Sequence, residues 1–562
     1  MSSVLRLGVR ATGLVACLGA VAACSGDESS EGAGGSGGTG GAAPTGDLAG
    51  DVLRYDYGFD LATGLATSRL TVGVVAGGDC FVVPSDLEPT SASFDAAPAV
   101  VTRDAASGAL RLCGAPVAAG AELVVDTAEL VPEGTFLGLD VGFSRQLDLA
   151  GGTFSYLLSW VGGCDHFGPC DDAPSRLAAF GFDVTHAPGT TVLCPGVRTA
   201  ASGSTHCELD GVLAPTYSAF ALAADPAWVA APFTTGAGVA VSFYEAPGGE
   251  LAASLSPTDV AAFLGWITGV LGPFPYGSEL RVAGGPTSWL GFEHPANIVL
   301  YESLPSLTGP YADPTRHVLM HEIVHQWAGD RTTLASAADF VWKEATAEYL
   351  AYVYEDEHGP AGEADATRAY WDAASQQSAH YPRPTDAPLP AVEDFYGDVY
   401  GPGPMVLYQQ LEALVGRPAV LAGIADFLAE PGARSVEELR AALEAASGAD
   451  LGPYFAAWVF GTGAPVWPSF VVGTSEVGGD VTVTLTQAGP VVFPCAVEVD
   501  VSGLAQTATA VVDFGTAPSS PSASVTVTLG EPLVTSTVDP RHRVIGAGSA
   551  FAKTAPLQVW RH

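Results

Sequence analysis

The feature that most constrains the fold is a pair of histidines four residues apart, His321 and His325, in the run HEIVH. The surrounding residues predict a helix, because Asp313 can cap its first turn and Gly329 can end it. Residues four apart on a helix lie on one face, so both imidazoles can bind a single metal ion. Glu322 lies next to that face, where it can act as a base toward a water on the metal.

A second predicted helix, in the run VWKEATAEY, offers a third ligand to the same ion. Glu344 lies 19 positions after His325. Two histidines and one carboxylate leave one position of a tetrahedral ion open, which is the catalytic arrangement for zinc. The ligand types therefore predict one Zn²⁺ ion held by His321, His325 and Glu344. Glu348 lies one helical turn beyond Glu344, and we expect it to hydrogen-bond a ligand histidine without touching the metal.

We expect the chain to be divided into several domains, since 562 residues exceed the usual size of one compact core. Alternating strands separated by Gly, Pro and Asp predict an N-terminal antiparallel β-domain over residues 50–248. The pattern is mostly helical over residues 249–466, which contain the metal-binding motif. Alternation returns in runs such as DVTVTLT, so residues 467–562 predict a C-terminal β-sandwich. The predicted fold class is multidomain α+β.

The first residues carry the pattern of an export signal. Two arginines precede a short apolar stretch that ends in the run VAAC, so residues 1–23 predict a signal peptide. Small residues directly before Cys24 resemble a bacterial lipoprotein signal, in which Cys24 becomes the lipidated first residue; ordinary signal cleavage is the alternative. Residues 24–49 are rich in Gly and Ser and predict a flexible tether. We therefore expect a periplasmic or cell-surface protein, attached to a bacterial membrane (the outer membrane is expected) only through its N-terminal lipid.

The net charge of −39 argues against some classes of partner. Binding phosphates needs clustered basic residues, and the chain has only two lysines, Lys343 and Lys553, so nucleic acid is not an expected partner. Electrostatic docking on an anionic membrane surface is disfavoured for the same reason. The acidity fits solubility outside the cell, with attraction of cationic peptides as the alternative.

Export also favours disulfides between the nine cysteines. Once Cys17 and Cys24 are set aside, neighbours in the sequence predict three pairs and leave Cys495 free: Cys80–Cys113, Cys164–Cys170 and Cys194–Cys207. The sequence alone leaves other connectivities open. The chain contains no CxxC pair, which argues against a zinc site made of cysteines.

These motifs resemble the zinc aminopeptidase family that includes aminopeptidase N, in which HExxH is followed after eighteen residues by the Glu of an NEGFA-like motif. Here HEIVHQWAGD is followed at that spacing by the Glu of KEATAEYL. Three further segments resemble family motifs in the same order: GPCDDAP at 168–174 resembles PCxDEP, LGFEHP at 290–295 resembles GxMEN, and YGPGPMVL at 400–407 resembles YxKGxxxL. The resemblance covers residues 50–465, including the whole predicted metal site.

The resemblance implies a thermolysin-like catalytic domain and a metallopeptidase, an aminopeptidase that removes N-terminal residues from peptide substrates with a zinc-activated water. In this scheme Glu322 is the catalytic base. Tyr400 stabilises the oxyanion, with Tyr396 as a rival for that role. Gly291 and Glu293 belong to the substrate-binding segment, in which Glu293 binds the free α-amine.

Several residues depart from the family pattern. His294 replaces the Asn of GxMEN, Lys343 replaces the Asn before the third ligand, and Pro402 replaces the Lys of YxKG. These departures remove neither a metal ligand nor the base, but they leave two alternatives open. One is a peptidase of other specificity, and the other is a zinc-containing surface lipoprotein that binds without turnover. An intact Glu322 argues against the second, since binding alone needs no base beside the metal.

Overall fold

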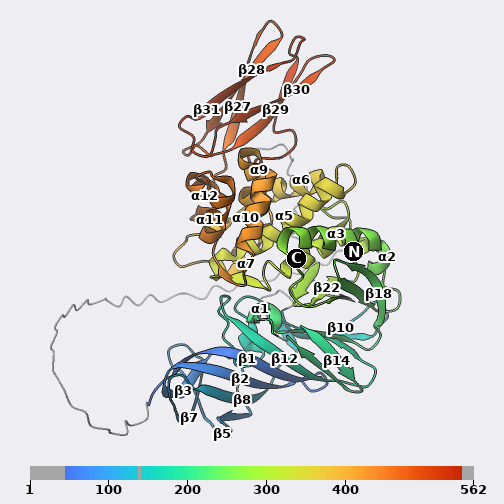
Figure 1. Ribbon diagram of the computed structural model, residues 1–562, viewed down its shortest axis with the longest axis vertical. Coiled ribbons are helices and arrows are strands. Elements are labelled where there is room, and N and C mark those ends of the chain that lie inside the picture. The colour runs from blue at the N-terminus through green and yellow to red at the C-terminus, as the bar shows by residue number, and fades with distance from the viewer. Residues whose placement is uncertain (1–44, 137–140, 210, 547–562) are drawn as a thin grey trace, which may run out of the picture. The chain divides into compact units, whose positions relative to one another are not determined.

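The computed structural model describes residues 45–136, 141–209 and 211–546 (Figure 1). The first part of the chain forms β-sheets, whose strands alternate buried and exposed side chains. In β2, every second side chain from Ala66 to Val74 is buried. The largest sheet has the strand order β14-β15-β12-β1-β2-β8-β4-β5, with β16 beside β12. Its strands are β1 (Ala49–Asp60), β2 (Leu65–Ala76), β4 (Ser91–Phe94), β5 (Ala97–Pro98), β8 (Glu122–Leu130), β12 (Leu177–Thr185), β14 (Val197–Ala201), β15 (Ser204–Glu208) and β16 (Ala214–Pro215). The predicted antiparallel pairing holds except between β1 and β12, which run parallel.

Two smaller sheets accompany the large one. One has the order β13-β17-β11-β10-β9 and the other the order β3-β7-β6. Their strands are β9 (Gly134–Phe136), β10 (Val141–Leu147), β11 (Thr153–Leu158), β13 (Thr191–Leu193) and β17 (Ala221–Asp225), and β3 (Gly78–Val83), β6 (Val100–Arg103) and β7 (Leu110–Val117). The three predicted disulfides are confirmed, and the free cysteine, Cys495, is buried. Cys24 and the rest of the predicted signal and tether up to residue 44 lie outside the described residues.

Strands on both sides of the predicted boundary between residues 248 and 249 form one sheet, with the order β18-β19-β20-β22-β21. Its strands are β18 (Val229–Gly236), β19 (Val239–Glu245), β20 (Glu279–Gly285), β21 (Gly291–His294) and β22 (Asn297–Tyr301). β19 pairs in parallel with β20, and the connection between them contains α3 (Pro257–Leu271). Strands β18 and β19 therefore pair with the metal-binding region rather than with the sheets that precede them. The described residues from 45 onward belong to one compact unit.

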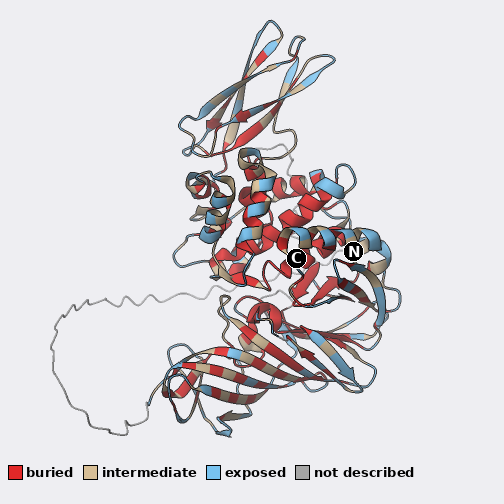
Figure 2. Cartoon of the chain, in the orientation of Figure 1, coloured by how far each residue is buried: buried red, intermediate tan, exposed pale blue. Residues whose placement is uncertain are grey.

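Helices dominate the region that follows, as predicted. They are α4 (Pro314–His325), α5 (Phe340–His358), α6 (Glu363–Ser375), α7 (Val392–Tyr400), α8 (Pro402–Pro404), a π-helix (Met405–Gln409), α9 (Gln410–Val415), α10 (Arg417–Phe427), α11 (Val436–Ser447) and α12 (Gly452–Trp458). Every residue of α5 from 340 to 355 is buried. In Figure 2 the middle of this helical region is mostly red, the colour of buried residues. Among the described residues, no helix is both long and apolar enough to cross a membrane.

The C-terminal β-sandwich is also confirmed. One three-stranded sheet has the order β27-β28-β31 and the other the order β30-β29-β32. The strands are β27 (Ser469–Val477), β28 (Asp480–Ala488), β29 (Ala496–Ser502), β30 (Thr507–Asp513), β31 (Ser522–Thr528) and β32 (Thr535–Val538). Val481, Val483 and Leu485 alternate as buried residues along β28, which is the pattern of a strand with one face in a core.

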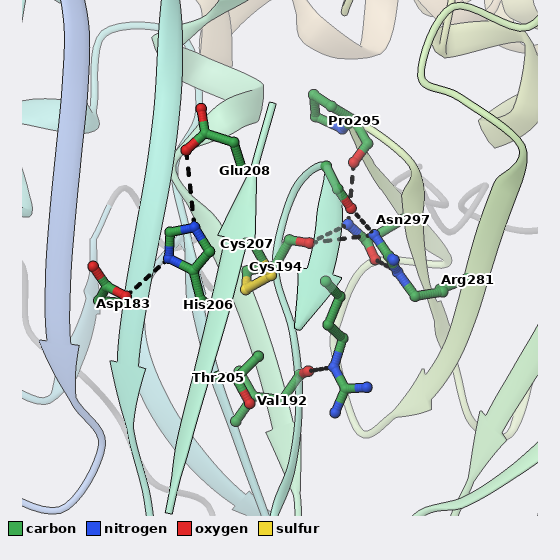
Figure 3. Close-up of a disulfide and its surroundings, with 12 residues drawn as sticks. Asp183, Val192, Cys194, Thr205, His206, Cys207, Glu208, Arg281, Pro295 and Asn297 are labelled. Carbon is green, nitrogen blue, oxygen red and sulfur yellow. Dashed lines mark hydrogen bonds and ion pairs between the residues drawn. A yellow bond between two sulfur atoms is a disulfide. The ribbon is translucent and has the colours of Figure 1, made fainter. Parts of the chain in front are cut away.

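A disulfide loop supports the hairpin that carries part of the site (Figure 3). Asn297, the first residue of β22, donates its side-chain amide to the Cys194 carbonyl at 2.9 Å. Arg281 of β20 donates to the Asn297 side chain at 2.7 Å and to the Gly196 carbonyl. The Cys194–Cys207 disulfide closes the segment that supplies these carbonyls. The hairpin β21–β22 is thus held from the side of the N-terminal sheets.

Candidate metal centre

Helix α4 presents the two histidines from one face, as their spacing predicts. Asp313 accepts a hydrogen bond from the Arg316 backbone N–H at 3.1 Å and caps the helix, with a proline at its first position. The helix ends at His325, four residues before Gly329, because the chain turns there and the Gly329 N–H bonds to the Thr332 carbonyl. The predicted stop at Gly329 was therefore one turn too late.

Three side-chain atoms converge on one point between α4 and α5. The Nε2 atoms of His321 and His325 are 3.0 Å apart, and Glu344 Oε2 lies 3.5 Å and 3.3 Å from them, respectively. Ligands about 2.0–2.1 Å from a tetrahedral zinc ion are separated by about 3.3 Å, so these three atoms fit one Zn²⁺. Each of the three residues is at most 3% exposed, which suits a metal held in a dry cavity.

The tautomers of both histidines are set by the hydrogen-bond partners of their Nδ1 atoms, which point away from the metal position. His321 Nδ1 lies 3.0 Å from Glu348 Oε2, and His325 Nδ1 lies 2.8 Å from the Ala328 carbonyl. A carboxylate and a carbonyl only accept, so Nδ1 carries the hydrogen in each ring and Nε2 presents its lone pair to the metal position. Glu348 therefore hydrogen-bonds His321, one of the predicted metal ligands.

Glu348 is the centre of a buried network that reaches well past the metal ligands. Its Oε2 atom also lies 3.1 Å from His317 Nε2, while its Oε1 accepts from Tyr311 and Trp371, each at 2.8 Å. On its other side, His317 Nδ1 lies 2.6 Å from Glu355 Oε1. Burial by itself lowers the pKa of His317, but the two carboxylates outweigh it and raise this pKa to about 10. His317 is thus an imidazolium held between two carboxylates.

Glu322 lines the same cavity, and one of its carboxylate oxygens accepts no hydrogen bond from the described residues. Its side chain is 1% exposed, and Oε1 has no hydrogen-bond partner among the described residues. Burial is the largest influence on its pKa, which is raised well above the ordinary value. Gly291 approaches so closely that a β-carbon there would collide with the Glu322 carboxylate. Gly291 therefore permits β21 to pass directly beside the predicted base.

Glu293 lies in this cavity as well. Single side-chain oxygens of Glu293 and Glu322 and a nitrogen of His325 all lie within 4.8 Å of one another. The hairpin that carries Glu293 is tied to the metal-binding helix by Gln326, which accepts from the Ala296 N–H at 2.8 Å and donates to the His294 carbonyl at 3.0 Å. The Glu293 carboxylate is therefore placed beside the metal position by a rigid link.

Lys343 completes this group of charges. Its Nζ lies 2.8 Å from Glu293 Oε1 and 2.7 Å from Glu344 Oε1. Burial alone lowers the pKa of Lys343, but the two carboxylates outweigh it and raise this pKa above its ordinary value. For Glu344, burial alone would raise the pKa, but the charges of Lys343 and His325 outweigh burial. The pKa of Glu344 is therefore lowered well below its ordinary value. Glu344 is accordingly a carboxylate whose Oε1 is held by Lys343 and whose Oε2 faces the metal position.

Two tyrosines, both buried, lie beside the third ligand. Tyr400 donates its hydroxyl to Glu344 Oε2 at 2.6 Å, and the hydroxyls of Tyr400 and Tyr396 are 2.7 Å apart. Both hydroxyls are therefore close to the metal position. Tyr396 lines the cavity together with Glu322. The two tyrosines that the sequence offered as alternatives for stabilising the oxyanion are therefore hydrogen-bonded to each other.

The cavity also has walls that the motifs did not indicate. Its lining includes Trp160 and Tyr217 from the N-terminal region and Phe340 from the start of α5. Tyr217 donates its hydroxyl to the Gly329 carbonyl at 2.8 Å, which joins the two regions behind the site. No local pattern marks these aromatic residues as part of the site, because they come together only through packing.

The arrangement defines a zinc metallopeptidase centre of the gluzincin type: an HExxH helix with a third glutamate ligand from a following helix. Comparison with known proteins agrees. Residues 297–458, which contain all three ligands, match the model of the Peptidase family M1 domain. A curated relative, "Probable aminopeptidase 1" of Sulfurisphaera tokodaii, is 28% identical over 167 residues, which cover 28% of this chain and 21% of the relative.

Solved structures share the fold. Legionella pneumophila aminopeptidase A in complex with aspartic acid superposes with a TM-score of 0.69 at 15% identity, over 88% of this chain and 59% of that one. A mutant M1 zinc metallopeptidase from Deinococcus radiodurans, also solved bound to a Tyr-Ser-Ala substrate, superposes with a TM-score of 0.58 at 21% identity, over 71% of this chain and 92% of that one. Over residues 297–458 the chain is therefore similar to the zinc metallopeptidases of peptidase family M1, and the predicted single Zn²⁺ is confirmed.

Proposed function

We propose that this protein is a zinc aminopeptidase that hydrolyses the first peptide bond of peptide substrates. The observation that carries the proposal is the position of Glu293, a second carboxylate fixed within 4.8 Å of Glu322 and His325. Hydrolysis itself needs only the metal and a base, so an additional carboxylate at this distance has a use in positioning the end of a substrate. The family's aminopeptidase members support the same assignment.

The residues of this chain divide the work as follows. Zinc, when bound, polarises the scissile carbonyl and lowers the pKa of a water molecule. Glu322 takes a proton from the attacking water through its unpartnered Oε1 and passes it to the leaving amine. The Tyr400 and Tyr396 hydroxyls donate hydrogen bonds to the oxygen on which negative charge develops. Aromatic walls that include Trp160 and Phe340 keep bulk water from these groups.

The test is hydrolysis of a panel of unblocked tripeptides and aminoacyl fluorogenic amides by the purified protein, with products identified by mass spectrometry. We expect release of the first residue, loss of activity with a chelator, and recovery on addition of Zn²⁺. Glu322→Gln keeps the size of the side chain and should lower kcat by about 10²–10⁴-fold while zinc stays bound at one equivalent. Cleavage at internal bonds would favour a peptidase of other specificity. Stoichiometric zinc without any hydrolysis would favour the non-catalytic binding protein.

We also propose that the protein is exported and lipid-anchored through Cys24 in a bacterial membrane, on the periplasmic or cell-surface side. The run VAAC and the three disulfides, which form in oxidising compartments, support this location. Cys24→Ser should move the protein from the membrane fraction to the soluble fraction. Retention of this variant in the membrane fraction would contradict a lipid anchor at this residue.

A further inference from the structure

The Lys343 ammonium lies in the part of the site that faces Glu293. Lys343 is 4% exposed, and its Nζ lies 2.8 Å from Glu293 Oε1. The same nitrogen lies 2.7 Å from Oε1 of the ligand Glu344, so it bridges the two carboxylates. Lys343, Glu293 and Glu344 all line the cavity that contains Glu322. A substrate that placed a charged amine against Glu293 would bring a second ammonium next to this one.

The surrounding residues are shaped to hold the lysine in this position. Gly329 adopts a φ of +134°, and a β-carbon there would lie 2.7 Å from Lys343 Cε and 3.2 Å from its Cδ. The Phe340 ring lies 5.6 Å from the ammonium, close enough for a cation–π contact. The stem of Lys343 thus runs over a glycine while its charged end is fixed by two carboxylates and a ring. Moving the ammonium away would leave the buried Glu293 carboxylate without this cation, which is unfavourable.

We propose that Lys343 is a specificity-determining residue that neutralises Glu293, so that the site accepts peptides with an uncharged amino terminus, such as N-acylated peptides, as readily as peptides with a free ammonium group. The inference rests on the proposed hydrolysis of the first peptide bond. Glu293 alone would attract an ammonium and reject a neutral group. Paired with Lys343, it offers no net charge, and like charges in close contact disfavour the second ammonium.

The test compares two substrates that differ only in the terminal group: an aminoacyl fluorogenic amide and its N-acetyl derivative, with kcat/KM measured for each. For the unaltered protein we expect the two values to agree within about 10-fold. Lys343→Met keeps the apolar stem and removes the charge, and we expect it to raise the preference for the free amine by about 100-fold. Glu293→Gln should act in the opposite direction, because the lysine then faces Glu344 alone and repels an ammonium more strongly. Zinc content is measured for every variant.

The outcomes separate the two proposals. If the unaltered protein prefers the free amine by more than about 100-fold, the role of Lys343 is refuted and the aminopeptidase assignment stands. If Lys343→Met retains zinc but lowers kcat/KM equally for both substrates, its role is structural and the inference is wrong. If neither substrate is hydrolysed by the zinc-loaded protein, the proposed function fails and the inference fails with it. If Lys343→Met does not fold, the unaltered protein and Glu293→Gln still decide the question.

Discussion

The strongest prediction concerns Glu348, which supports the zinc ligand His321 without touching the metal position. Its carboxylate accepts from four donors: His321 and His317 on Oε2, and Tyr311 and Trp371 on Oε1. In Glu348→Gln, only one side of the group remains an acceptor. If the amide oxygen faces Tyr311 and Trp371, its NH₂ group faces the hydrogen on His321 Nδ1, and the imidazole loses the partner that fixes its orientation.

The magnitude follows from what such supporting groups contribute. Mutation of a residue that orients a metal-ligating histidine typically weakens metal binding by about 10–100-fold, or about 1.4–2.8 kcal/mol. We expect the upper part of this range, because His321 and Glu348 are both fully buried and water cannot replace the lost bond. Zinc affinity is measured at equilibrium by competition with a chromophoric chelator at constant pH.

Glu355→Gln is the matched control. Glu355 is also a buried carboxylate on α5, and it contacts His317 at 2.6 Å and Thr367 at 3.1 Å but not His321. Each substitution removes one of the two carboxylate charges that contact the His317 imidazolium, so both should lower the melting temperature. Only Glu348→Gln should lower zinc affinity by more than about threefold. Equal zinc affinity in the two variants, or no loss in Glu348→Gln, would refute this reading of the network.

Three further predictions test other parts of the molecule. Burial raises the pKa of Glu129 to about 7, above the ordinary value of 4.5, so the folded protein loses stability as the pH rises from about 4.5 to about 7. By pH 8 this loss amounts to about 3 kcal/mol of the free energy of unfolding. Glu129→Gln should remove the loss, as measured by urea unfolding at both ends of the range. Gly291→Ala should lower kcat/KM by about 10–100-fold with zinc still bound, because the new methyl group displaces the Glu322 carboxylate; unchanged kinetics would contradict the close approach. Replacing both Cys194 and Cys207, which lie 13 positions apart, by alanine should lower the free energy of unfolding by about 3 kcal/mol in chemical denaturation, and a loss below about 1 kcal/mol would contradict a stabilising role for this disulfide.

Some parts of the site were predictable because they depend on short stretches of chain. The spacing of His321 and His325 places both rings on one face of any helix, whatever surrounds it. Pairing between neighbouring cysteines and the alternation along β28 are equally local, and the structure contains both. The end of α4 was placed one turn too late, because the bonds that stop it come from the turn beyond the helix and not from its own sequence.

Other parts depend on contacts between residues far apart in the sequence. The parallel pairing of β19 with β20 joins strands on either side of the predicted boundary at residue 248, and no composition change marks it. Lys343 looked like a simple departure from a family motif. Its ion pair with Glu293, 50 positions earlier, appears only when β21 and α5 both pack against α4.

The sequence by itself determined the metal ligands' spacing, the class of metal and the order of β, helical and β regions, because helix periodicity and strand alternation are properties of neighbouring residues. Only the tertiary structure decided which groups surround those ligands: the four donors on Glu348, the Tyr400 hydroxyl beside Glu344, and the lysine beside Glu293. A buried charge must find partners wherever packing brings them, and those partners come from segments that no local pattern connects.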